Sequence, residues 1–182
     1  MKIKNLTSLV LCIFLGLGCL ICGFFINKTF YITINKNILQ ERIQHLESII
    51  LDVESIKLAE FKDSVYLYIQ ELNIDHPEIV FKQACIESGH FRSQLFVEHN
   101  NMFGMKMPRL RPTVGKIKTE SRFKEYAYYN NWKESVIDYA IYQSYTAKKL
   151  SEKEYLDHLK RSYAEDTTYV TVIEKMHIKK AK

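Results

Sequence analysis

The sequence feature that most constrains the fold is an uncharged apolar run from Leu6 to Ile26. At about 21 residues, the run is long enough for an α-helix to cross the hydrocarbon core of a bilayer. Lys2 and Lys4 precede it, and the positive-inside rule keeps such charges in the cytoplasm and sends the rest of the chain outward. We therefore expect residues 1–27 to be a single-pass transmembrane helix in the cytoplasmic (inner) membrane.

Two other interpretations of the apolar run stay open. A cleaved secretory signal needs a small-x-small cleavage site, which we do not find before the next polar residues. A lipoprotein would be modified at Cys19, but Gly16 stands where a leucine is expected. Cys85 is the one cysteine outside the run, so the rest of the chain is not a disulfide scaffold, and we interpret Cys85 as a buried core residue.

A predicted spacer region follows the apolar run. Asn27 to Asn37 is polar and β-branched, which indicates an extended connector. Ile38 to Lys57 then shows a helical pattern, in which Leu39, Leu46 and Val53 repeat every seven residues. The repeat fits a spacer helix that packs on the following domain, and it fits equally a homodimeric coiled coil formed by residues 38–57.

Glu87 is the one carboxylate that an otherwise apolar helix carries inward. Val80, Ala84, Glu87 and Phe91 are spaced i, i+4, i+7 and i+11, which places them on one helical face. A carboxylate on such a face must be paired, protonated or functional, because burying it alone and ionised is costly. Desolvation raises the pKa of a carboxyl group, as a general acid near neutral pH requires.

The remaining pattern predicts a mostly helical domain with one small insertion. Val114 to Thr119 and Phe123 to Tyr129 are β-prone and flank Glu120, which indicates a two-stranded hairpin with Glu120 at its tip. Further helices are expected over about 58–72, 77–89, 132–143 and 152–161, with a last one after Asp166.

Charge and histidine spacing exclude two other classes of function. The formal net charge is +5, and much of the excess lies at the termini, too diffuse to indicate nucleic-acid binding. His90 and His99 flank the Glu87 region, but their spacing matches no metal-binding motif such as HExxH. No metal or cofactor is expected.

Four blocks of the sequence occur in an informative order: Ile86–Gly89, Asn101–Lys106, Tyr126–Val136 and Tyr163–Tyr169. Together they resemble the successive blocks of the bacterial endo-β-N-acetylglucosaminidase family of peptidoglycan hydrolases, of the flagellar and autolysin type. The resemblance covers roughly residues 58–177, and the apolar run and the heptad region lie outside it.

The resemblance implies an α+β, mostly α, lysozyme-like fold with a groove between a helical lobe and a small β-hairpin lobe. It also implies hydrolysis of the β-1,4 bond on the reducing side of N-acetylglucosamine in cell-wall glycan. We therefore expect a transmembrane anchor (1–27), a connector and heptad helix (28–57), and a catalytic domain (58–182) that faces the periplasm or cell wall and binds peptidoglycan strands.

The same resemblance implies roles for individual residues. Glu87 matches the family's general acid, and Tyr163 matches a tyrosine placed near the scissile bond. Substrate contacts are expected at Asn101, Phe103, Tyr126 and Tyr169.

The family often places a second carboxylate in the β-lobe, where it activates water. Glu120 is the first candidate here and Glu125 the second. If Glu120 is the base, the reaction should invert the configuration of the anomeric carbon. If neither glutamate reaches the groove, the substrate's own acetamido group or a mobile loop is expected to activate the water. Two other functions stay open: a lytic transglycosylase, which needs one glutamate, and a non-catalytic wall-binding scaffold that dimerises through residues 38–57.

Overall fold

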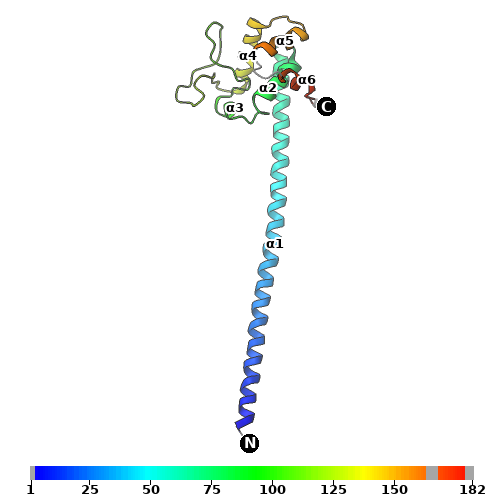
Figure 1. Cartoon of the computed structure of the whole chain (residues 1–182), viewed down its shortest axis with the longest axis vertical. Coiled ribbons are helices and arrows are strands. Elements are labelled where there is room, and N and C mark those ends of the chain that lie inside the picture. Colours follow the sequence, from blue (N-terminus) through cyan, green and yellow to red (C-terminus); the bar gives the residue numbers. More distant parts are fainter. Residues whose placement is uncertain (1–2, 163–167, 179–182) are drawn as a thin grey trace. The chain divides into compact units, whose positions relative to one another are not determined.

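The computed structural model of the chain describes residues 3–162 and 168–178. Six helices lie within these residues and are labelled in Figure 1. The chain divides into two compact units, Met1–Lys57 and Leu58–Lys182. Helix α1 (Ile3–Glu71) supplies the described part of the first unit and, with its last residues, enters the second.

Helix α1 continues through the segment that we expected to be an extended connector. Asn27 to Asn37 is helical, so this prediction is wrong, and the heptad helix is part of the same element. The reason is that the sequence has neither glycine nor proline between Phe24 and Glu71, and the β-branched residues there lower helix propensity only slightly. The heptad residues Leu39, Leu46 and Val53 are all exposed.

The backbone of the predicted transmembrane segment is helical, but most of its side chains lie outside what the structure describes. Within Leu6–Ile26, only the side chains of Leu17 and Phe24 belong to the described residues, and both are exposed. No helix in the described part of the chain is long and apolar enough to cross a membrane.

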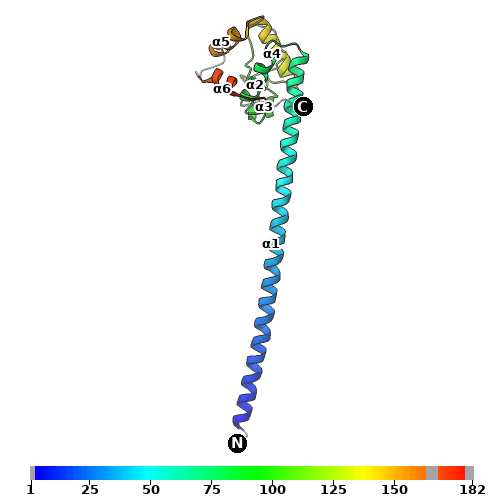
Figure 2. The same ribbon diagram turned by 90° about the vertical axis from the view of Figure 1, so that its right-hand side faces the viewer.

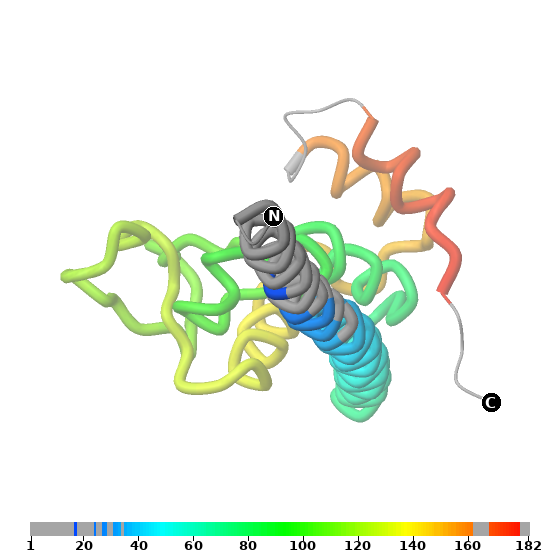
Figure 3. Tube along the Cα trace, turned by 90° about the horizontal axis from the view of Figure 1, so that it is seen from below, coloured from blue at the N-terminus to red at the C-terminus, as the bar shows by residue number. Residues whose placement is uncertain are grey.

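The second unit is built from the end of α1 and five shorter helices. These are α2 (Pro77–Glu87), α3 (Gln94–His99), α4 (Trp132–Thr146), α5 (Glu152–Ser162) and α6 (Tyr169–Lys175). Figures 2 and 3 show α6 beside α5, and α6 also contacts α2. The mostly helical class that we expected is therefore confirmed.

The core of this unit joins α1, α2 and α4. Val65 and Ile69 of α1 and Val80 and Ala84 of α2 are fully buried, as is Tyr139 of α4. Burying such apolar surface contributes about 25 cal/mol per Å², so it is the main term that holds the helices together. Proline stands at the first position of α2, where its missing N–H costs nothing, as the sequence predicts.

The predicted hairpin does not form a sheet in the described residues. Lys116 and Tyr128 exchange two backbone hydrogen bonds of 2.9 Å, which make an isolated antiparallel bridge, and a second bridge joins Lys106 to Tyr126. The segment 125–128 makes hydrogen bonds to 105–107 on one side and to Lys116 on the other, and each pairing stops at an isolated bridge. We call residues 104–130 the irregular lobe. It is the loop segment without helices or strands that connects α3 and α4 in Figure 1.

Candidate active site

Glu87 is the last residue of α2, and a tight turn follows it. Ser88 ends the helix: its Oγ donates to the Ala84 carbonyl at 2.5 Å and accepts from the Phe91 N–H at 2.8 Å. Gly89, His90 and Phe91 then have φ values of 55°, 56° and 66°. This left-handed conformation costs a non-glycine residue about 1–2 kcal/mol, so the surrounding structure holds the turn in place.

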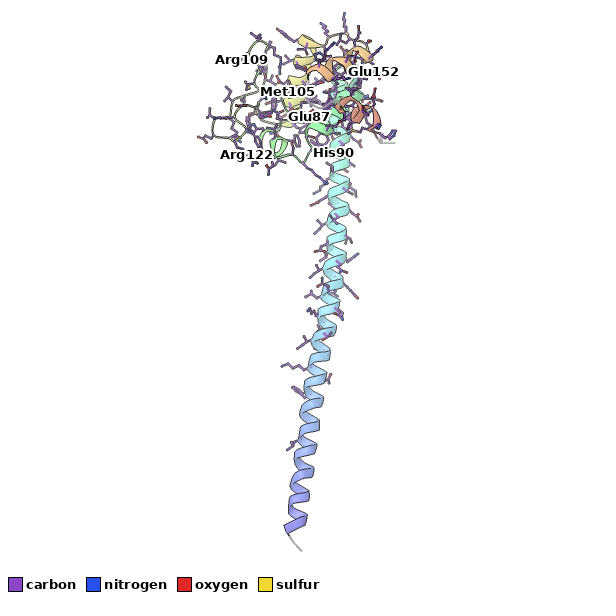
Figure 4. All side chains as sticks on the ribbon, in the orientation of Figure 1. Glu87, His90, Met105, Arg109, Arg122 and Glu152 are labelled. Carbon is purple, nitrogen blue, oxygen red and sulfur yellow. The ribbon has the colours of Figure 1, made fainter. Side chains whose placement is uncertain are left out.

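The two carboxyl oxygens of Glu87 face different parts of the structure. The Tyr169 hydroxyl, from α6, donates to Oε1 at 2.7 Å. Oε2 faces Gly104, where a methyl group added to the backbone would lie 3.6 Å from this oxygen. Gly104 has a φ of 63°, a conformation that glycine adopts without strain. Figure 4 labels Glu87 and also Met105, which follows Gly104 in the chain.

The environment of Glu87 raises the pKa of its carboxyl group. Burial disfavours the ionised form and is the larger effect, while the hydrogen bond from Tyr169 lowers the pKa against it. The net change is upward, so Glu87 holds its proton to a higher pH than an ordinary glutamate. This is the property that the sequence pattern predicts for a general acid.

Asn101 closes the turn that carries Gly104. Its side-chain amide donates to the carbonyls of Met105 at 2.8 Å and Ala127 at 2.9 Å, and its Oδ1 accepts from the Met105 N–H at 2.9 Å. Phe103 stacks on Tyr139 with ring centroids 4.2 Å apart. Asn101 and Phe103 are both fully buried, so they support the site from beneath; substrate contact by either stays a prediction.

Asp138 of α4 ties the irregular lobe to the helices. It forms a two-pronged ion pair with Arg111 at 3.0 and 2.9 Å, and it accepts from the Tyr129 hydroxyl at 2.8 Å. Burial opposes ionisation of Asp138, but the hydrogen bonds from Arg111 and Tyr129 outweigh it and hold the pKa below its ordinary value. Sequence reasoning missed this anchor, because no local pattern pairs residues so far apart.

Glu120 and Glu125 are both exposed in the irregular lobe. The residues after Glu120 are tied to α3: Ser121 Oγ lies 2.6 Å from His99 Nε2, and Arg122 binds Glu98 at 2.6 Å. The side chain of Glu120 itself extends into solvent. Its role as a water-activating base stays a prediction, as does that of Glu125.

The remaining predicted residues lie as follows. Tyr126 is half-buried, with the Lys106 ammonium 5.9 Å from its ring centre. Tyr169 is half-buried and bonds to Glu87, as described above. Tyr163 lies outside the described residues. Among the described side chains, no group of three or more His, Cys, Asp and Glu residues is placed to hold a metal ion.

Gln83 is a further buried polar residue next to the site that sequence reasoning missed. It lies one helical turn before Glu87 and is fully buried, and its amide donates to the Tyr169 hydroxyl at 3.4 Å. The available signal was its position, four residues before Glu87 on the same helical face.

Comparisons with known proteins identify the family of the chain. Residues 62–182 match the model of the glucosaminidase family, described as mannosyl-glycoprotein endo-beta-N-acetylglucosaminidase. No curated protein matches the chain. Among solved structures, the chain is similar to the catalytic domain of the autolysin Auto from Listeria monocytogenes, with 22% identity and a TM-score of 0.44 over 64% of this chain and 80% of that one. The family model covers more than half of the sequence, so this chain belongs to the glucosaminidase family and is a glycoside hydrolase of the endo-β-N-acetylglucosaminidase type, as its sequence blocks predict.

Proposed function

We propose that this glycoside hydrolase cleaves the β-1,4 bond on the reducing side of N-acetylglucosamine, with Glu87 as its general acid. The observation that carries the proposal is the setting of Glu87. It is a partly buried carboxyl group with a raised pKa, at a helix end, with one oxygen bound by Tyr169 and the other facing the Gly104 turn. Cleavage of a glycosidic bond requires a protonated carboxyl at the leaving oxygen, and such a group supplies it.

The second half of the reaction needs an activated water on the opposite face of the sugar. We assign this step to Glu120, because its side chain extends into solvent from a loop that Ser121 and Arg122 tie to α3. A base in this role predicts an inverting reaction, in which the two carboxyl groups stand roughly 6.5–9.5 Å apart when substrate is bound. Tyr163 is proposed to act near the scissile bond.

The N-terminal region supplies the proposed location of the enzyme. The uncharged run Leu6–Ile26 and the preceding Lys2 and Lys4 support an inner-membrane anchor, with the catalytic unit facing the periplasm or cell wall. Pairing of two copies through residues 38–57 is supported by the exposed heptad side chains on α1.

The test uses the full chain, purified in detergent, as wild type and as Glu87→Gln. Each is incubated with purified peptidoglycan, and the released fragments are reduced with borohydride and identified by mass spectrometry. We expect reduced N-acetylglucosamine ends from wild type and a fall in release of about 10²–10⁴-fold in Glu87→Gln. Glu152→Gln, which changes an exposed glutamate on α5, is the matched control and should keep full activity.

Three results would contradict the proposal. Anhydro-muramic ends would identify a lytic transglycosylase instead. Binding to walls without release by a folded wild-type chain would identify a non-catalytic scaffold. Full activity in Glu87→Gln would remove Glu87 from the reaction.

A further inference from the structure

A buried hydrogen-bonded chain leads from Glu87 into the helical core. Gln83 of α2 accepts through its Oε1 from the hydroxyl of Tyr139 on α4 at 2.6 Å and from that of Tyr155 on α5 at 3.1 Å. The two hydroxyls are themselves 2.5 Å apart, so one of them shares its single proton between Gln83 and the other hydroxyl. Gln83, Tyr139 and Tyr155 are all fully buried, so these polar groups depend on one another for their hydrogen bonds.

The Gln83 amide has its oxygen toward these two hydroxyls and its amino group toward Tyr169. The amino group donates to the Tyr169 hydroxyl at 3.4 Å. Tyr169 therefore accepts from Gln83 and directs its single proton to Glu87 Oε1 at 2.7 Å.

The direction of these bonds distinguishes the two oxygens of Glu87. Oε1 accepts a proton from Tyr169, so when Glu87 is neutral its own proton belongs on Oε2. Oε2 is the oxygen that faces the Gly104 turn. We propose that Gln83 is a positioning residue: acting through Tyr169, it keeps Oε1 as an acceptor and so places the catalytic proton of Glu87 on Oε2. This inference rests on the proposed role of Glu87 as the general acid.

The tyrosines remain donors at any pH at which the enzyme works. Burial raises the pKa of Tyr155 to about 12 and holds the pKa of Tyr169 well above its ordinary value. Tyr169 from α6 contacts Glu87, and Tyr155 from α5 contacts Gln83. Glu87 is therefore the group of this network whose charge changes at pH values below the pKa values of the tyrosines.

Removing the Tyr169 hydroxyl has a defined effect on the pH dependence of the enzyme. Its hydrogen bond favours the ionised carboxylate, so its loss raises the pKa of Glu87. A general acid works while it is protonated, so the alkaline limb of the rate profile must move to higher pH. A purely structural role for Tyr169 and Gln83 would lower the amount of folded enzyme and leave the limb in place.

The experiment measures initial rates of peptidoglycan release against pH for the full chain. The variants are Tyr169→Phe, Gln83→Met and the double variant, with Cys85→Ala as the matched control, because Cys85 is a buried residue of the same helix. We expect Tyr169→Phe to move the alkaline limb upward by about one pH unit. Gln83→Met should move it the same way by less, and the double variant no further than Tyr169→Phe alone. Cys85→Ala should leave it unchanged.

The outcomes separate this inference from the proposed function. If the alkaline limb stays in place in Tyr169→Phe and Gln83→Met while Glu87→Gln is inactive, the role of Gln83 is overturned. The role of Glu87 as the general acid then still stands. An additional shift from Gln83→Met in the Tyr169→Phe background also overturns it, because Gln83 would then act by another route. An active Glu87→Gln defeats the proposed function instead. If Gln83→Met does not fold, Tyr155→Phe removes one hydroxyl from the amide oxygen and should move the limb upward by a smaller amount.

Discussion

Glu87 and Glu120 are the two carboxyl groups assigned to the reaction, and their surroundings differ sharply. Glu87 ends a helix whose other residues are mostly buried, and α6 supplies its hydrogen-bond partner. Glu120 is exposed in the irregular lobe. The two residues that follow it, Ser121 and Arg122, contact His99 and Glu98 of α3. The first group is placed by the core of the fold, whereas the second is placed by a few side-chain contacts at the surface.

The difference matches the two chemical tasks. An acid must hold its proton to a higher pH than an ordinary carboxyl group does, and desolvation in a helical core provides this, although the Tyr169 hydrogen bond acts against it. A base needs access to water, and an exposed loop provides it. We infer that loss of local structure affects the two groups unequally: Glu120 responds to changes in loop contacts, and Glu87 to changes in the core.

The largest expected effect that tests this comparison is that of Glu120→Gln. Loss of the base should lower the rate of peptidoglycan hydrolysis by about 10²-fold, while the fold is kept. Glu125→Gln is the matched control, since Glu125 is an exposed glutamate in the same lobe and should have little effect. Equal, near-wild-type rates for both variants would leave Glu87 as the one essential carboxyl group among the three, and the reverse ranking would make Glu125 the base.

A smaller effect is expected from releasing the loop that carries Glu120. Arg122→Ala removes the ion pair with Glu98 and the hydrogen bond to Gln94. Both partners of this ion pair are exposed, so the free energy of unfolding should change by less than about 1 kcal/mol. The hydrolysis rate should nevertheless fall several-fold, because Glu120 is no longer held.

Arg109→Ala is the control for this experiment, because Arg109 is an exposed arginine of the same lobe, labelled with Arg122 in Figure 4. Urea unfolding and rate measurements on both variants check the prediction. Unchanged rates in Arg122→Ala would show that the position of Glu120 does not depend on this contact.

The smallest effect concerns stability at the Glu87 end of the comparison. The pKa of Glu87 is raised on folding, so the folded chain binds more protons than the unfolded chain at pH values above the ordinary glutamate pKa. Wild-type stability must therefore fall as the pH rises through the interval between the unfolded and folded pKa values. Glu87→Gln lacks this titration, so its stability relative to wild type should rise with pH. Urea unfolding at a series of pH values measures the difference, and a relative stability that is constant with pH would contradict the raised pKa.

The parts of the fold that could be predicted from sequence are those set by local pattern. Pro77 and Gly89 mark the two ends of α2, and the apolar periodicity around Glu87 placed its side chain against the core. The continuity of α1 was missed because polar, β-branched residues from Asn27 to Asn37 suggested an extended segment, although no residue there breaks a helix.

The parts that could not be predicted depend on contacts between distant residues. β-Prone stretches on both sides of Glu120 predicted a hairpin, but they meet at one isolated bridge, and the second stretch also pairs with residues 105–107, a contact that sequence periodicity does not show. Similarly, the contact of Tyr169 with Glu87 joins residues 82 positions apart. Local patterns identify which residues are chemically suited to a site, and the tertiary fold decides which of them meet.

The way in which the irregular lobe is held has a consequence for how this site can change during evolution. A β-sheet is secured by backbone groups that every residue carries, so it tolerates many sequences. The irregular lobe instead depends on a few side chains. Asn101 holds its first turn, and Asp138 binds the side chains of Arg111 and Tyr129. Substitution at one of these positions would alter the conformation of the whole lobe at once, whereas most other positions of the lobe remain open to variation.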